Sequence, residues 1–398
     1  SSFIGFPEIF RFRLTNGTDY DKMSVSMKFR KAPDDPFFGE SKVKGKLPMT
    51  GKYMAYVGSY SYTGKAKGIT VYDVDVEAGK FIYRCEVEVD NSSYLKASQN
   101  GQILYSIADE GVVAFRILPN GSLARLNSAN IRGMRGCHLS TSKNDDYIFI
   151  SGFHDGKITV LNLNKDGSVG QIADGVFHKG LGSVAERSFR PHVSCSRLTP
   201  DERFLMVADL GIDQIKVYRF DHKDGKITLV DTIRCELESA PKYFMFSSDG
   251  RFFYVLYELK NTIDVFSYKE GERVPIVEKI QTISSTGTAP NQLTAACAMH
   301  LSPDGKHLFC SNAGDNTVSM YDRDDETGML TMRFCLPISG DYPKDIAIFP
   351  DGQHLASINH DGSISFFKIN YEKGLLVMSD RSIEVNEPNC CEIVKIGE

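Results

Sequence analysis

Ser302-Pro303-Asp304-Gly305-Lys306-His307 is the stretch that decides the fold, because it is one copy of a motif that recurs along the chain. Proline presets the first turn angle, aspartate hydrogen-bonds back to the backbone, and glycine accepts a positive φ, so each copy predicts a tight turn. The copies recur at intervals of roughly 45 to 57 residues, a period that is typical of β-propeller blades. Further clear copies begin at Ser247 and Phe349, and weaker ones at Ser98, Ser142 and Thr199.

An apolar run precedes each turn, and two alternating runs follow it. In the fifth repeat these runs are residues 242–246, 252–257 and 262–268, which are rich in β-branched and aromatic residues and therefore predict strands. We denote the strands of a blade A to D from the channel outward, so that strand A precedes the turn. Matching A strands begin near Tyr94, His138, His192, Lys242, Cys297 and Lys344.

A seventh blade is divided between the two ends of the chain. Residues 53–58, 68–74 and 81–85 have the pattern of strands B, C and D, but no A strand precedes them. Residues 388–394 have the pattern of an A strand without a blade, and placing them in the first blade would close the ring and remove an open edge. The sequence therefore predicts an all-β fold, a seven-bladed β-propeller of four-stranded antiparallel blades that the C-terminal strand closes.

Residues 1–50 lie outside this pattern, so we expect an N-terminal extension of residues 1–50 and a propeller of residues 51–398. Residues 10–14 and 23–27 of the extension alternate like short strands. One interpretation is that the extension packs on the propeller or at a partner, for example in a homo-oligomer. The other is a partly ordered tail.

Composition and charge restrict the partners and the compartment. The net charge of −5 and the pI of about 6.0 predict neither nucleic acid nor an anionic membrane as a partner. The nine cysteines are scattered and form no CxxC motif, which favours reduced thiols in the cytoplasm over disulfides. No apolar stretch approaches the roughly 20 residues that span a bilayer, and the first residues lack the features of a signal peptide.

From Tyr56 to Val394 the chain resembles the lactonase family of seven-bladed propellers, of the 6-phosphogluconolactonase and carboxymuconate cyclase type. The resemblance implies an enzyme of carbohydrate metabolism, either a hydrolase that opens a sugar lactone or related cyclic ester or an isomerase that runs the reverse ring closure. The segments that carry it occur in the same order in the family; they are residues 56–60, 67–69, 91–95, 111–115, 136–140, 191–193, 208–213, 240–243 and 258–259.

The resemblance also implies a site. Its catalytic residues would be His192, in the Pro-His of the fourth blade, and Glu258, in a loop of the fifth. Lys242 stands where the family has an arginine, and lysine keeps the charge but loses the bidentate fork. Ala313 and Ala298 replace a second arginine and an acidic residue of the family.

The starts of the A strands and the B–C loops would share one rim of the channel. Opening a lactone with water needs a base for the water and a cation or hydrogen-bond donor for the developing oxyanion, which these residue types supply. No spacing typical of a metal or cofactor site occurs, so neither is predicted. With His192 and Glu258 as catalytic residues, the predicted substrate-binding residues are Lys242, His138, Arg190, Lys344, Tyr94 and Asp209.

Two functional hypotheses from different classes remain. The first is a lactonase or cycloisomerase that acts on a small lactone or organic acid. The second is a propeller that has lost catalysis and serves as a ligand-binding or assembly subunit, which the alanines at 298 and 313 favour. Each candidate also has a structural interpretation: His192 as a buried histidine, and Asp209 as a turn-forming acid.

Overall fold

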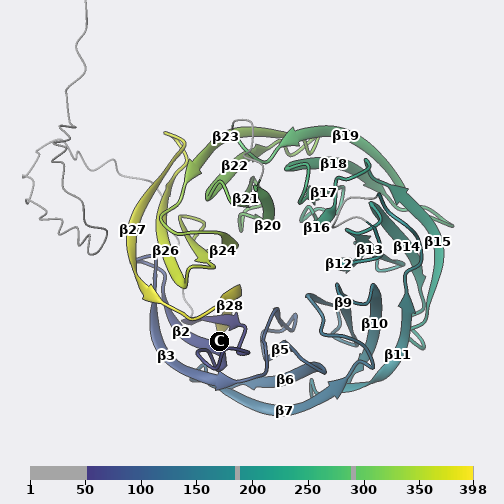
Figure 1. Ribbon diagram of the computed structural model, residues 1–398, viewed down its shortest axis with the longest axis horizontal. Coiled ribbons are helices and arrows are strands. Elements are labelled where there is room, and N and C mark those ends of the chain that lie inside the picture. The colour runs from purple at the N-terminus through teal and green to yellow at the C-terminus, as the bar shows by residue number, and fades with distance from the viewer. Residues whose placement is uncertain (1–51, 184–188, 288–292, 398) are drawn as a thin grey trace, which may run out of the picture. The chain divides into compact units, whose positions relative to one another are not determined.

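A computed structural model describes residues 52–183, 189–287 and 293–397 of the chain. The expected extension of residues 1–50 lies outside the described residues. The described residues form seven four-stranded antiparallel sheets arranged as a ring (Figure 1), so the predicted fold is confirmed. In spatial order from the channel outward, the first three blades are β28 (Pro388–Ile396), β1 (Lys52–Ser59), β2 (Gly68–Asp75) and β3 (Lys80–Glu88); β4 (Leu95–Ala97), β5 (Ile103–Ala108), β6 (Gly111–Ile117) and β7 (Leu123–Asn130); and β8 (His138–Thr141), β9 (Tyr147–Gly152), β10 (Lys157–Leu163) and β11 (Val169–Phe177).

The remaining four blades follow the same order. They are β12 (Val193–Leu198), β13 (Phe204–Asp209), β14 (Gln214–Phe220) and β15 (Ile227–Arg234); β16 (Pro241–Phe246), β17 (Phe252–Tyr257), β18 (Thr262–Lys269) and β19 (Ile276–Ser284); β20 (Ala295–Leu301), β21 (His307–Ala313), β22 (Thr317–Arg323) and β23 (Leu330–Pro337); and β24 (Pro343–Ile348), β25 (His354–Asn359), β26 (Ser363–Asn370) and β27 (Leu375–Glu384).

The C-terminal strand β28 closes the ring as the sequence predicts. It pairs with β1 in antiparallel register, with Val394 opposite Met54 and Cys391 opposite Val57. Strand β1 thereby has a partner on both sides, β28 and β2. Strand addition by the far end of the chain removes an edge that would otherwise be open.

The core lies between neighbouring blades. Strand β17 is buried along its whole length, because the faces of its sheet pack on the blades before and after it. Phe253 of β17 stacks on Phe266 of β18, with ring centroids 4.7 Å apart. Strand β19, on the circumference, alternates between exposed and half-buried residues. Apolar side chains on both faces of the middle strands thus hold the blades together.

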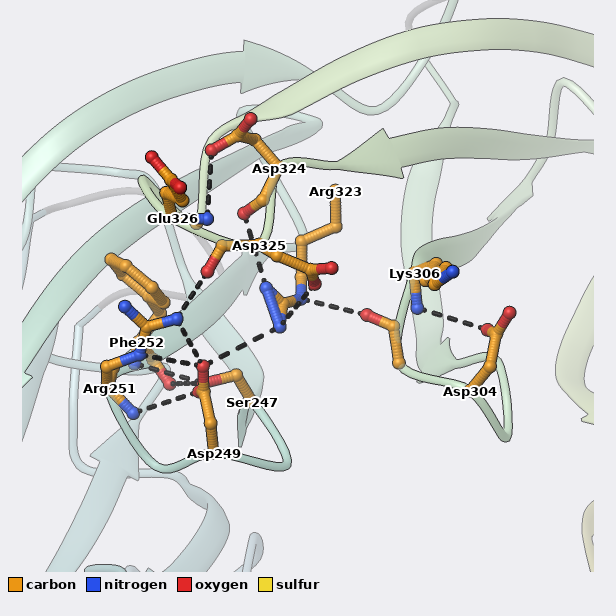
Figure 2. Close-up of polar contacts among 12 residues, drawn as sticks. Ser247, Asp249, Arg251, Phe252, Asp304, Lys306, Arg323, Asp324, Asp325 and Glu326 are labelled. Carbon is orange, nitrogen blue, oxygen red and sulfur yellow. Dashed lines mark hydrogen bonds and ion pairs between the residues drawn. The ribbon is translucent and has the colours of Figure 1, made fainter.

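The Asp-Gly turns also connect neighbouring blades (Figure 2). Gly250 and Gly305 both have φ near +70°, as the predicted turns require. The Arg323 side chain at the end of β22 donates from Nε to the Gly305 carbonyl at 2.9 Å, and its guanidinium lies 3.9 Å from the Asp249 carboxylate. Arg323 therefore joins the turn of the fifth blade to that of the sixth.

The innermost strands carry a shared irregularity. In five blades the pairing of the A strand with the B strand shifts by one residue, which marks a β-bulge. A bulge interrupts the two-residue alternation, so two successive side chains can reach the same side of the strand. The residues that the register skips are Ser194, Lys242, Cys297, Lys344 and Asn389.

Candidate active site

A cavity of about 690 Å³ opens among the A strands and the B–C loops of the ring. Its volume is in the range of small-molecule sites. All five bulged residues line it. So do seven of the eight site residues expected from the sequence, namely Tyr94, His138, Arg190, His192, Lys242, Glu258 and Lys344.

Lys242 and Glu258 form an ion pair in this cavity. The Lys242 Nζ lies 2.7 Å from Oε2 of Glu258, which follows β17 and is 6% exposed. The same Nζ lies 3.8 Å from the Cys297 sulfur. Burial alone would lower the pKa of Lys242, but Cys297 and Glu258 outweigh it and raise that pKa above its usual value. Lys242 is therefore a fixed positive charge in the cavity wall.

His192 is held in one orientation and one tautomer. Its ring stacks on Phe153 with centroids 4.3 Å apart, and its Nδ1 lies 2.7 Å from the Phe153 carbonyl oxygen. A carbonyl oxygen only accepts, so Nδ1 carries the hydrogen and Nε2 of the neutral ring is left as an acceptor. The residue is 5% exposed. Nε2 is thus suited to take a proton from a small molecule in the cavity.

Asp209 is the one predicted site residue that does not line the cavity among the described residues. It is fully buried behind His192. Its Oδ1 accepts the backbone N–H of His192 at 2.8 Å and that of Gly211 at 3.1 Å, and its Oδ2 lies 2.7 Å from Nδ1 of His178. The carboxylate therefore positions the backbone of His192, which directly precedes β12.

His138 contributes an uncharged wall. The residue is 1% exposed, and its ring lies between those of Tyr94 and Tyr243, with centroids 4.8 and 5.7 Å away. Burial lowers the pKa of His138 well below its usual value and raises that of Tyr94 well above. The two side chains therefore form an uncharged part of the cavity lining.

Arginine and lysine side chains also lie on the cavity wall. Arg190 is exposed, with its guanidinium carbon 5.7 Å from the Phe189 ring centroid. Lys344 Nζ lies 4.8 Å from the centroid of Tyr342. Arg135, which the sequence reasoning missed, pairs with Asp109 at 3.0 Å. An anionic or polyhydroxylated ligand would therefore meet several donors.

The sequence reasoning also missed His300 and Asp345, which line the same cavity. His300 stands two residues after Ala298 on β20, so strand alternation could have indicated it. Asp345 adjoins Lys344, and alternation alone would place the two on opposite sides. The bulge in β24 brings both to the cavity, and nothing in the sequence announces that bulge.

Two further features are absent from the part of the chain that the structure describes. Within the described ranges, no group of three or more His, Cys, Asp or Glu side chains is placed to hold a metal ion. The same residues contain no helix with the length and apolar character needed to cross a bilayer.

Comparison with known proteins identifies the family to which the chain is similar. The family model described as "Lactonase, 7-bladed beta-propeller" matches residues 54–393. A Bacillus subtilis 6-phosphogluconolactonase is 27% identical over 353 residues, covering 86% of this chain and 99% of the relative. Among solved structures, a Bacteroides fragilis 6-phosphogluconolactonase candidate has a TM-score of 0.79 and 30% identity, covering 88% of this chain and all of its own.

A second solved structure bears a different substrate in its name. The periplasmic gluconolactonase of Pseudomonas aeruginosa matches with a TM-score of 0.80 and 25% identity, covering 87% of this chain and all of its own. The repeats, the closed ring and the family match over residues 54–393 agree. The chain belongs to the lactonase family of seven-bladed β-propellers.

Proposed function

We propose that the protein is a lactonase that opens a sugar lactone or a related cyclic ester in the cavity. The observation that carries the proposal is the presence of His192, Lys242 and Glu258 in the lining of one cavity, with Lys242 and Glu258 paired at 2.7 Å. A base with a fixed tautomer and a permanent cation are what ester hydrolysis by water needs.

In the proposed mechanism, His192 Nε2 takes a proton from the attacking water. The Lys242 ammonium stabilises the negative charge that develops on the carbonyl oxygen, because it is charged before the reaction and needs no reorganisation. We give the role of base to His192 rather than Glu258, since Oε2 of Glu258 is engaged by Lys242. Glu258 then holds the cation in place.

We further propose that the preferred substrate carries less negative charge than a phosphorylated sugar lactone. Ala313 is fully buried where the family has an arginine, and Lys242 offers no bidentate fork to a phosphate. The name of the Pseudomonas relative, a gluconolactonase, supports a substrate without phosphate. Titration calorimetry with gluconate and 6-phosphogluconate would test it, and tighter binding of the phosphorylated acid would contradict it.

The reverse ring closure, as in a cycloisomerase, would use the same groups, with His192 returning the proton.

A cytoplasmic location remains our proposal as well, and the nine free thiols support it. We do not expect nucleic acid or membrane partners, given the net charge of −5.

The second candidate function is a propeller that binds a small ligand without turning it over. The alanines at 298 and 313 favour it, because they remove charged groups from the place where the family has them. A turnover screen on neutral and phosphorylated lactones, corrected with protein-free blanks, separates the two. Rates above the blanks support the lactonase, whereas binding at blank rates supports the second candidate.

A further inference from the structure

His300 and Asp345 form an acid–base pair on the cavity wall that the proposed mechanism does not yet use. His300 lies near the end of β20 and Asp345 on β24, so adjacent blades supply them. Nε2 of His300 lies 2.9 Å from Oδ1 of Asp345. The histidine side chain is 33% exposed and the aspartate 11%, so the imidazole is the partner that a ligand can reach.

Asp345 is held firmly from two strands. Its Oδ1 also accepts the backbone N–H of Ile346 at 2.9 Å, and its Oδ2 accepts that of Cys391, on β28, at 2.9 Å. A carboxylate with these bonds can only accept from His300, so Nε2 of His300 carries a hydrogen. The carboxylate therefore fixes the imidazole by one nitrogen.

The other nitrogen of His300 is the one that remains for chemistry. Within residues 52–183, 189–287 and 293–397, no group is recorded in a hydrogen bond to His300 Nδ1. The ring centroid of Tyr243 lies 6.3 Å from that of His300. An imidazole anchored by a carboxylate, with one nitrogen open to a cavity, is the arrangement that general acids and bases use.

We propose that His300, positioned by Asp345, is the general acid that protonates the ring oxygen of the lactone as the ring opens; this rests on the proposed lactonase function. Water oxygen bonds to the carbonyl carbon while His192 takes the water proton. The bond between that carbon and the ring oxygen then breaks, and its electron pair receives the Nδ1 proton of His300, which acts in its imidazolium form with a proton on each ring nitrogen. Solvent returns a proton to His300 and removes one from His192, so the net reaction is lactone plus water to hydroxy acid.

The step needs an acid because the ring oxygen of an aliphatic lactone would otherwise leave as a strongly basic alkoxide. A positioned general acid contributes about 10²–10⁴-fold in rate to such a step. An aryl lactone differs, because its ring oxygen leaves as a phenoxide. A phenoxide is a much weaker base than an alkoxide, so its departure gains little from protonation. The dependence of the rate on the leaving group therefore distinguishes an acid from a group that merely supports the fold.

The test is the kcat/KM of wild type and His300→Gln on δ-valerolactone and on dihydrocoumarin, whose leaving group is a phenoxide. Glutamine keeps an N–H for Asp345 but cannot act as an acid. We expect a loss of about 10²-fold on δ-valerolactone and a loss within about threefold on dihydrocoumarin. Asp345→Asn, a change in the positioning residue, should show the same leaving-group dependence with a smaller loss.

His307→Gln is the matched control, because His307 pairs with Asp322 at 3.0 Å and does not line this cavity. It should leave both rates unchanged. Equal losses on the two lactones, or no loss, in a folded His300→Gln protein would overturn the inference and leave the lactonase function standing. A wild type that hydrolyses neither lactone above the blank would overturn the proposed function and the acid role with it.

Discussion

The ion pair between Lys242 and Glu258 shows how single residues set the chemistry of this cavity. Lysine carries a charge that can be lost on burial, and Cys297 and the carboxylate at 2.7 Å prevent that loss. The Glu258 side chain is 8% exposed and that of Lys242 is 31% exposed, so removing one partner leaves the other charge uncompensated at a partly buried site. Glu258 is thus expected to matter for the position and charge of Lys242 even if it never touches the substrate.

Glu258→Gln should therefore lower kcat/KM on a hydrolysed lactone by about 10²-fold, the size of effect seen when one oxyanion donor is lost. The fold should persist, because glutamine has the same shape. Steady-state rates and thermal melts would measure both. Glu236→Gln is the matched control, since Glu236 pairs with Lys260 at 3.0 Å on an exposed surface. Activity of Glu258→Gln within about twofold of wild type would refute the role.

The burial of His138 predicts how the stability of the protein depends on pH. Its pKa in the fold lies well below the usual 6.5 because of burial. Well above pH 6.5 the His138 ring is neutral in both the folded and the unfolded chain, so it adds no pH dependence to the free energy of unfolding. Below pH 6.5 the unfolded chain binds a proton that the folded chain does not, so the free energy of unfolding falls as the pH falls.

At pH 5.5 the free energy of unfolding should be lower than at pH 7.5, with a contribution from His138 on the order of 1 kcal/mol, because pH 5.5 lies below the usual pKa of histidine. His138→Phe keeps an aromatic ring between Tyr94 and Tyr243 but cannot titrate. Urea unfolding at both pH values should show a smaller acid loss in the variant. His178 has a lowered pKa as well and remains as a background. Equal acid losses in the two proteins would contradict the prediction.

The strands show what a sequence can and cannot reveal at the scale of elements. Turn motifs such as Ser302–His307 indicate where strand A ends and strand B begins, because proline, aspartate and glycine each favour the backbone conformation of a tight turn. The bulges are different from the turns, because no particular residue type is required at a bulge. The extra residue is accommodated by the packing of neighbouring blades. The rule that the starts of the A strands face the channel found Lys344 but not Asp345, and the sequence gave no sign that Asp209 would lie outside the cavity lining.

Closure by β28 is the element-scale feature with the largest structural consequence. Deleting residues 388–398 should leave the edge of β1 open and remove Cys390, Val394 and Ile396 from a core cluster. We expect a lower melting temperature and aggregation, because an unpaired edge recruits other chains. Light scattering after gel filtration and a thermal melt would measure both. A monomeric truncated protein with an unchanged melting temperature would count against the closure.

The whole ring brings together groups that are distant in the sequence. His192 comes from the fourth blade, Lys242 and Glu258 from the fifth, His300 from the sixth and Asp345 from the seventh. The repeat made this convergence foreseeable, since A strands of all blades line one channel. What it could not supply is the partner of each side chain, because contacts such as that of His192 with Phe153 depend on the packing of loops.

The central claim is that this cavity hydrolyses a lactone with His192 as base. The most direct measurement is the initial rate of δ-gluconolactone hydrolysis by wild type and His192→Gln, each corrected for the protein-free rate. The account predicts a wild-type rate clearly above the blank and a loss of about 10²-fold or more in the variant. A wild-type rate equal to the blank, or a folded His192→Gln protein as active as wild type, would contradict it.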